Sequence, residues 1–333
     1  MLNLTTRYLN DDAIATLVRS MAEIAQFQTT QQREAFTHAS RKADGSEVSD
    51  VDTQSQQMLG DTLRAISPYP IVGEEHALTE NLNALAADTP VWVVDPLDGT
   101  ASYLRGFDEY AINVGLLSAP DAQGNRTPVF GAVMFPAKGQ VFFTNARGEA
   151  KHALLRPKPN EELFVHPPTP LRCKPFHLHR GVLKIATGFR ESDDEEKGAA
   201  FFGAAFDASH AARPVKYEGE APAKITCMSH TGAYRTAQML RHERDIALFA
   251  RPSMIWDTAA LDAIVRAAGG VVAPIDVGTK SIIGSSLYYG NDPARYLDGH
   301  VLANSPYMAA HKKLPREIGL QGAQHIDLSG LTR

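Results

Sequence analysis

Acidic residues gather at three places in the 333-residue chain, in patterns that could do chemistry. They follow two short apolar runs and open one helical segment: Glu74 and Glu75, Asp95 and Asp98, and Asp257. Each has an ordinary interpretation when taken alone. The glutamates could lie in a solvated turn, Asp-Pro-Leu-Asp-Gly-Thr at 95–100 is rich in turn residues, and Asp257 could cap a helix.

Taken together, the clusters indicate a metal site. Asp95 and Asp98 come at the carboxyl end of a predicted buried strand, where α/β-type proteins place ligands. Converging carboxylates would repel one another and raise each other's pKa, and hard divalent cations remove that repulsion. Gly99 permits close approach of the backbone, and the Gly99 and Thr100 amides would face an anion if a helix starts there. The pattern predicts metal-assisted hydrolysis of a phosphate ester.

The elements that must position these residues differ between the two halves. Helical spacing of apolar residues covers 12–28 and 52–66, and Pro68 and Pro70 end the second helix. The polar stretch 37–50 predicts a mobile loop. Apolar runs predict strands at 91–94, 111–117, 129–135 and 140–144. The first half is therefore predicted to place two helices on a largely antiparallel sheet.

The second half alternates strands and helices, which favours an α/β arrangement. Strands are predicted at 183–186, 225–228 and 246–249, and helices at 192–210, 231–240 and 258–268. Ser192 and Glu195 fit a capping box, so the acidic run 193–196 is interpreted as a helix start. The Pro-rich stretch 156–175 predicts a boundary. The expected organisation is an α+β subdomain (1–155) with the metal motifs and an α/β subdomain (156–333) that completes the active site.

Composition excludes several function classes. A net charge of −5 argues against broad contact with a nucleic-acid duplex. The sequence has no apolar run of about 18 residues, which argues against a membrane span, and its start lacks the pattern of a secretory signal. Two cysteines, Cys173 and Cys227, do not make a disulfide framework, so a cytoplasmic location is expected.

Three segments resemble the signatures of the inositol monophosphatase superfamily, in the family's order: VGEEH at 72–76, WVVDPLDGTASYLRG at 92–106 and IWDTAALDAIVRAAGG at 255–270. KADGSEVSDVD at 42–52 is similar to the family's mobile loop, and DGHVLANSPYMAAHKKL at 298–314 to its ending. The resemblance implies a layered α-β-α-β-α sandwich of two subdomains. It also implies a homodimer and inhibition by lithium.

The resemblance also implies a ligand set for two or three Mg²⁺ ions. Glu74, Asp95 and the Leu97 carbonyl would hold the first ion, and Asp95, Asp98 and Asp257 the second. A third, weaker ion would involve Glu74. Such paired ions lie roughly 3.5–4 Å apart and clamp both oxygens of an in-line displacement.

The family's chemistry uses a metal-activated water and implies no covalent enzyme intermediate. By resemblance, Thr100, oriented by Asp52, would help to activate the water together with Glu74. The Gly99 and Thr100 amides would hold the phosphate. Asp50 is an extra acid in this loop, where relatives more often carry a single Asp.

Four further residues are candidates for substrate binding. Lys42 could approach the site when the loop closes, or remain a solvated lysine. Arg190 and Arg235 could bind a second anionic group, because guanidinium matches phosphate geometry, or could be surface arginines. His230 could contact the leaving group or cap the helix that follows.

The predicted function is that of a magnesium-dependent phosphomonoesterase acting on a small inositol or sugar monophosphate. One alternative is a 3'(2'),5'-bisphosphate nucleotidase, which needs a second anion site. Others are a histidinol-phosphate or fructose-bisphosphate phosphatase. A further alternative is a regulatory binding protein on a phosphatase scaffold, although the full set of acidic residues weighs against loss of catalysis.

Overall fold

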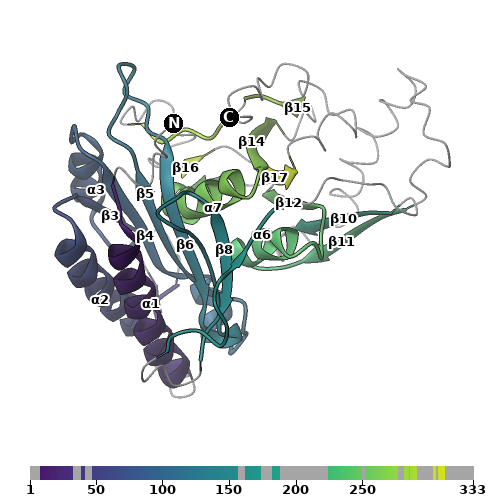
Figure 1. Cartoon of the computed structure of the whole chain (residues 1–333). Coiled ribbons are helices and arrows are strands. Elements are labelled where there is room, and N and C mark those ends of the chain that lie inside the picture. Colours follow the sequence, from purple (N-terminus) through teal and green to yellow (C-terminus); the bar gives the residue numbers. More distant parts are fainter. Residues whose placement is uncertain are drawn as a thin grey trace.

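The computed structural model describes residues 8–32, 39–41, 47–156, 162–173, 182–187, 224–249, 252–276, 281–284, 286–290, 303–304 and 307–311. Figure 1 shows two helices on one side of a large sheet, further helices on its other side, and a second sheet beyond them. No helix in this part of the chain is long and apolar enough to cross a membrane.

The first half contains α1 (Asp11–Gln32), β1 (Ala39–Arg41), β2 (Glu47–Ser49), α2 (Asp50–Ile66), β3 (Ile71–Gly73), α3 (Leu78–Leu85), β4 (Val91–Asp98), α4 (Thr100–Leu104), β5 (Ala111–Leu117), β6 (Pro128–Phe135), the 3-10 helix η2 (Pro136–Lys138), β7 (Gln140–Thr144), β8 (Ala150–Leu154) and β9 (Thr169–Pro170). The second half contains β10 (Val182–Thr187), β11 (Lys224–Ser229), α6 (Gly232–Leu240), β12 (Ile246–Phe249), β13 (Ser253–Met254), α7 (Ile255–Ala267), β14 (Gly270–Asp276), β15 (Ser281–Ile282), β16 (Ala303–Asn304) and β17 (Tyr307–His311).

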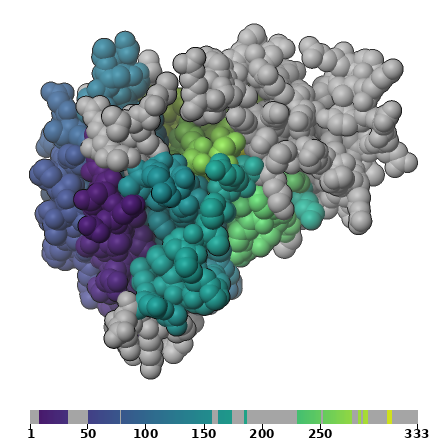
Figure 2. Space-filling model, in the orientation of Figure 1, coloured from purple at the N-terminus to yellow at the C-terminus, as the bar shows by residue number. Residues whose placement is uncertain are grey.

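The first sheet has the order β3-β4-β5-β6-β7-β8-β9. Only its β3–β4 pair is parallel, so the predicted antiparallel character is confirmed. All seven residues of β5 are buried, because α1 and α2 cover one face of the sheet and α7 lies on the other (Figure 1). In Figure 2 the purple residues of α1 lie beside the teal residues of this sheet, and the green residues of the second half border them.

Two glycines allow α7 to approach this sheet closely. A Cβ atom at Gly131 of β6 would lie 2.2 Å from the carbonyl oxygen of Ala260, and one at Gly115 of β5 would lie 3.0 Å from the Ala259 Cβ. The small side chains of Ala259 and Ala260 complete the contact from the helix. α7, which carries Asp257, is therefore seated directly on the sheet that carries the other acidic motifs.

The second sheet has the order β11-β10-β12-β17-β14-β15. Its β10–β11 and β10–β12 pairs are parallel, and β17 is antiparallel to both β12 and β14. The described residues thus form an α-β-α-β series, and the predicted mixed α+β fold class is confirmed. The helix predicted over 192–210 lies outside the described residues.

Several element boundaries differ from those predicted. The strand predicted at 91–94 continues through the acidic motif to Asp98, and the helix predicted from 258 begins at Ile255. The described ends of the predicted loop 37–50 form an antiparallel pair, β1–β2. The first sheet also passes the proposed division at 155/156, because β9 pairs with β8. That division stays a prediction.

Candidate active site

Three carboxylates from the two halves of the chain meet at one place. One oxygen from each of Asp95, Asp98 and Asp257 lies within 4.8 Å of the others. Asp95 is buried, and Asp98 and Asp257 are half-buried. β4 supplies two of these residues and the first turn of α7 supplies the third, so the close contact between α7 and the first sheet creates the cluster.

An irregularity in β4 turns Asp95 and Asp98 toward the same side. Residues three apart on a regular strand point to opposite faces. Here the pairing register between β4 and β5 shifts between Asp95 and Asp98, as in a β-bulge, which re-aims a side chain. Two hydrogen bonds hold this stretch: Leu97 N donates to Asp95 Oδ1 at 2.8 Å, and Gln28 Nε2 of α1 donates to the Pro96 carbonyl at 2.8 Å.

Asp257 is held by its own helix. Its Oδ2 accepts the backbone N–H of Met254 at 2.9 Å, and α7 starts three residues before the predicted position. The sequence correctly associated Asp257 with the helix start but placed it outside the helix. It lies in the first turn, where the helix dipole favours a negative charge.

The electrostatics of the cluster favour a bound cation. Burial raises the pKa of Asp95 well above its usual value, and the charges of Glu74, Asp98 and Asp257 raise it further. Burial and the charges of Asp98 and Glu74 likewise raise the pKa of Asp257. Several carboxylates in mutual repulsion are an all-oxygen donor set of the kind that hard divalent cations take. The residues present therefore fit a hard divalent cation such as Mg²⁺.

Glu74 stands at the end of β3, in a turn that is fixed on several sides. Its N–H donates to the Val94 carbonyl at 3.3 Å, and the next amide, that of Glu75, donates to Gln56 Oε1 of α2 at 3.1 Å. The Asn81 side chain of α3 bonds both the N–H and the carbonyl of Gly73. Glu74 lies outside the tight group of three carboxylates, but its charge acts on two of them.

Thr100 opens α4 directly after the acidic motif. Its hydroxyl lies 2.9 Å from Asp52 Oδ1 and 3.1 Å from the Leu97 carbonyl oxygen. Asp52 is buried in the first turn of α2. Gly99 caps α4 with φ of 90°, a left-handed conformation that glycine adopts without strain. The structure thus pairs Thr100 with Asp52, as the resemblance implied.

The start of α6 reaches the same place from the second half. Ala233 N donates to Asp98 Oδ2 at 2.7 Å, and a Cβ atom at Gly232 would lie 2.3 Å from both carboxylate oxygens. Burial raises the pKa of Asp98, and this N–H and the charge of Arg235 oppose that rise. We did not identify the Ala233 contact from the sequence, since an alanine amide carries no sequence signal.

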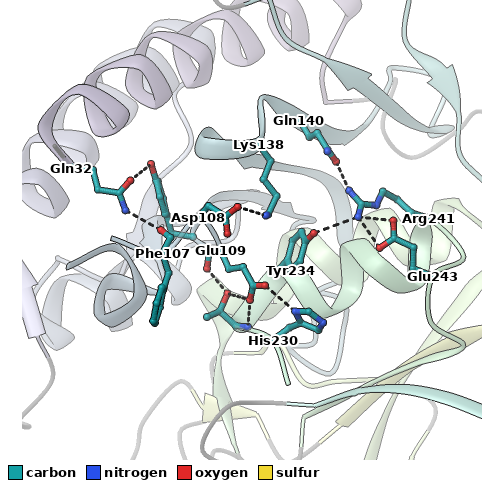
Figure 3. Close-up of polar contacts among 12 residues, drawn as sticks. Gln32, Phe107, Asp108, Glu109, Lys138, Gln140, His230, Tyr234, Arg241 and Glu243 are labelled. Carbon is teal, nitrogen blue, oxygen red and sulfur yellow. Dashed lines mark hydrogen bonds and ion pairs between the residues drawn. The ribbon is translucent and has the colours of Figure 1, made fainter. Parts of the chain in front are cut away.

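The predicted substrate residues divide into three groups. His230 packs against Glu109, with Nδ1 at 2.9 Å from Glu109 Oε1 (Figure 3). Arg235 donates to the carbonyls of His230 and Leu248 at 3.1 and 2.9 Å and lies over the Phe249 ring at 4.4 Å. Lys42 and Arg190 lie outside the described residues. Glu109 was missed by the sequence analysis.

With this geometry in place, comparison with known proteins identifies the family. The model of the inositol monophosphatase family matches residues 9–318. The chain belongs to the inositol monophosphatase family. Its predicted resemblance to that family is thereby confirmed, over nearly the whole chain.

Individual relatives match only part of the chain or match it at low sequence identity. The Nus factor SuhB of Xylella fastidiosa is 34% identical over 112 residues, which cover 33% of this chain and 36% of that protein. The chain thus matches about a third of that relative's length. The CysQ structure from Bacteroides thetaiotaomicron has a TM-score of 0.62 at 18% identity, covering 91% of this chain and 98% of that one.

A staphylococcal inositol monophosphatase-1, solved as an inhibitory complex soaked in 100 mM LiCl, has a TM-score of 0.60 at 15% identity. The structural match covers 93% of this chain and 94% of the staphylococcal chain. At such identities, the two structures show that the fold is shared, and the activity and substrate of this chain need evidence of their own.

Proposed function

We propose that this protein is a magnesium-dependent phosphomonoesterase that hydrolyses a small phosphorylated metabolite. The observation that carries the proposal is the convergence of Asp95, Asp98 and Asp257 within 4.8 Å, beside a threonine–aspartate pair. Family membership supports the same reaction class.

The proposed metal ligands are Glu74, Asp95, Asp98, Asp257 and the Leu97 carbonyl. When bound there, two or three Mg²⁺ ions would neutralise the carboxylates and supply Lewis-acid activation of water and leaving group. The Gly99 and Thr100 amides, at the start of α4, would bind the phosphate oxygens. The phosphate is assigned to this helix start because the proposed metal ligands Asp95 and Asp98 directly precede it in the chain.

The chain's own proton acceptor would be the Thr100–Asp52 pair. Water attacks phosphorus as its proton passes to Thr100 Oγ1, and the threonine proton passes to Asp52 Oδ1, 2.9 Å away. The bond from phosphorus to the ester oxygen breaks, and the leaving oxygen takes a proton from solvent. Inorganic phosphate and an alcohol result. Glu74 would share the task of orienting the water.

The substrate class is the part of the proposal that an assay must assign. Phosphate release is measured with Mg²⁺ on inositol 1-phosphate, 3'-phosphoadenosine 5'-phosphate, fructose 1,6-bisphosphate and histidinol phosphate. We expect one substrate to be clearly preferred, with the inositol or sugar phosphates first. Asp95→Asn serves as the inactive control. Absence of release from every substrate by protein that binds Mg²⁺ would refute these four substrate assignments and shift weight to an untested substrate or to a regulatory role.

Lithium sensitivity is proposed on the same basis. The staphylococcal structure is an inhibitory complex soaked in LiCl, and the acidic cluster here offers carboxylate oxygens to a small cation. Phosphate release should therefore fall as LiCl is added and should not fall with an equal concentration of KCl. Equal effects of the two salts would count against a lithium site.

A further inference from the structure

Glu109 joins the two halves of the chain beside the acidic cluster. It lies in the loop between α4 and β5 and faces His230 (Figure 3). Its partners, His230 and Thr231, immediately precede α6. Glu109 Oε1 lies 2.9 Å from His230 Nδ1, and Oε2 accepts Thr231 N at 3.1 Å. The Glu109 backbone carbonyl also accepts the Thr231 hydroxyl. One residue of the first half thus holds two consecutive residues of the second.

These contacts are sheltered from water. The side chains of His230 and Glu109 are 9% and 16% exposed. Burial acts to raise the pKa of Glu109, but the hydrogen bonds from His230 and Thr231 outweigh it and lower that pKa. Glu109 is therefore ionised at neutral pH, and charge-assisted hydrogen bonds in a poorly solvated site are stronger and shorter than neutral ones.

The segment held by Glu109 leads directly to a proposed metal ligand. Two residues after Thr231, Ala233 N donates to Asp98 Oδ2 at 2.7 Å. Between them, Gly232 passes so close to Asp98 that an added Cβ would lie 2.3 Å from its oxygens. A small shift of the segment would either break the Ala233 hydrogen bond or press the backbone against the carboxylate. The orientation of Asp98 therefore depends on where residues 230–231 are held.

We propose that Glu109 is a positioning residue for the metal centre, acting through His230 and Thr231 on the contact between α6 and Asp98. The inference rests on the proposed function, because it assumes that Asp98 binds a metal ion. Residues that orient metal ligands typically change metal affinity 10–100-fold when they are replaced. Glu109→Ala should therefore weaken Mg²⁺ binding by about tenfold or more.

The far end of α6 offers a matched control. Arg241 donates to Gln140 Oε1 of β7 at 2.8 Å and pairs with Glu243 at 2.6 Å (Figure 3). It therefore also fastens α6 to the first sheet. Arg241 donates to the Tyr234 hydroxyl at 3.4 Å as well, but among the described residues it makes no hydrogen bond or ion pair with residues 230–233 or with Asp98. Arg241→Met keeps much of the apolar stem and removes these polar contacts. A purely structural role for Glu109 predicts that the two variants behave alike.

The experiment titrates Mg²⁺ alone into metal-free full-length protein by isothermal titration calorimetry. The thermal midpoint is measured in EDTA for each variant. Glu109→Ala is expected to bind Mg²⁺ about tenfold more weakly, whereas Arg241→Met keeps the wild-type dissociation constant despite a lower midpoint. Glu109→Gln can still accept the Thr231 amide through its side-chain oxygen, so it should recover part of the lost affinity and safeguards the test if the alanine variant does not fold.

Two results would overturn the inference in different ways. Wild-type affinity in both Glu109 variants, with Mg²⁺ binding intact in the unmodified protein, would refute the positioning role alone. Failure of the unmodified protein to bind Mg²⁺ would refute the proposed function and this inference with it. The two failures are therefore distinguishable in one set of titrations.

Discussion

Replacement of Gly131 by alanine tests how tightly the first sheet and α7 must pack. The new Cβ would lie 2.2 Å from the Ala260 carbonyl oxygen and 3.0 Å from the Ala260 Cα, both backbone atoms that cannot rotate away. Ordinary van der Waals contact begins at 3.4 Å, so α7 must recede by about 1 Å. Overpacking of this kind costs about 1–3 kcal/mol, partly offset by roughly 0.4–1 kcal/mol because alanine restricts the unfolded chain.

The centres of these two ranges give a net loss of about 1.3 kcal/mol in the free energy of unfolding of the metal-free protein. Because Asp257 lies one turn before Ala260 on α7, the shift should also weaken Mg²⁺ binding. Urea unfolding followed by tryptophan fluorescence measures the first effect, since Trp92 is buried in β4 and Trp256 lies on α7. Calorimetric titration with Mg²⁺ measures the second.

Gly60→Ala is the matched control for this substitution. Gly60 lies inside α2, and the nearest atom to its added Cβ is the end of the flexible Arg64 side chain at 3.2 Å. Alanine is favoured over glycine inside a helix by roughly 0.5–1 kcal/mol, so this variant should be more stable than the parent. The packing argument would be refuted if Gly131→Ala unfolded at the parent's urea midpoint and bound Mg²⁺ with the parent's affinity.

Three further predictions concern the site and its support. Asp95→Asn should stabilise the metal-free protein at pH 7 and abolish its Mg²⁺-induced rise in thermal midpoint. Because the folded-state pKa of Asp95 lies above its unfolded value, the free energy of unfolding of the parent in EDTA should fall as pH rises through the raised pKa. A flat pH profile would contradict this. Thr100→Val should lower kcat by about 10²-fold, and Thr100→Ser should keep most of the parent's kcat, as measured by steady-state phosphate release. An equal loss in both variants would exclude a role for the hydroxyl. Arg126→Met should cost about 3 kcal/mol in urea unfolding, because the buried guanidinium donates to carbonyls of Leu85, Thr89 and Ser118; an unchanged midpoint would disprove that role.

Local patterns predicted the long elements of the fold and missed the short ones. The segments predicted at 111–117 and 140–144 match β5 and β7 to the residue, because a strand buried on both faces is mostly apolar along its length. β3 and α3 have only three and eight residues, too few for a helical or strand period to stand out. α3 nevertheless matters for the site, since Asn81 holds Gly73 beside Glu74.

The acidic residues of the cluster were predictable because their signal is local. Asp95, Asp98 and Thr100 lie within six residues of one another, and Asp257 lies at the start of a helical pattern. Their common orientation was not predictable, since Asp95 and Asp98 are three residues apart on a strand and would point to opposite faces without the shift in register. Pro96, which cannot donate a ladder hydrogen bond, is the residue that signals such an irregularity.

What the sequence could not reveal is how the two halves are joined at the site. Ala233 meets Asp98 across 135 residues of sequence, and His230 meets Glu109 across 121. Neither Glu109 nor Ala233 belongs to a recognisable pattern, because a loop glutamate and a helix-start amide are common everywhere. Yet these two contacts determine where α6 lies against the carboxylates. The residues of the proposed metal site can thus be predicted from local spacing, while the residues proposed to position them depend on the docking of the halves, and the Glu109 titrations test that distinction directly.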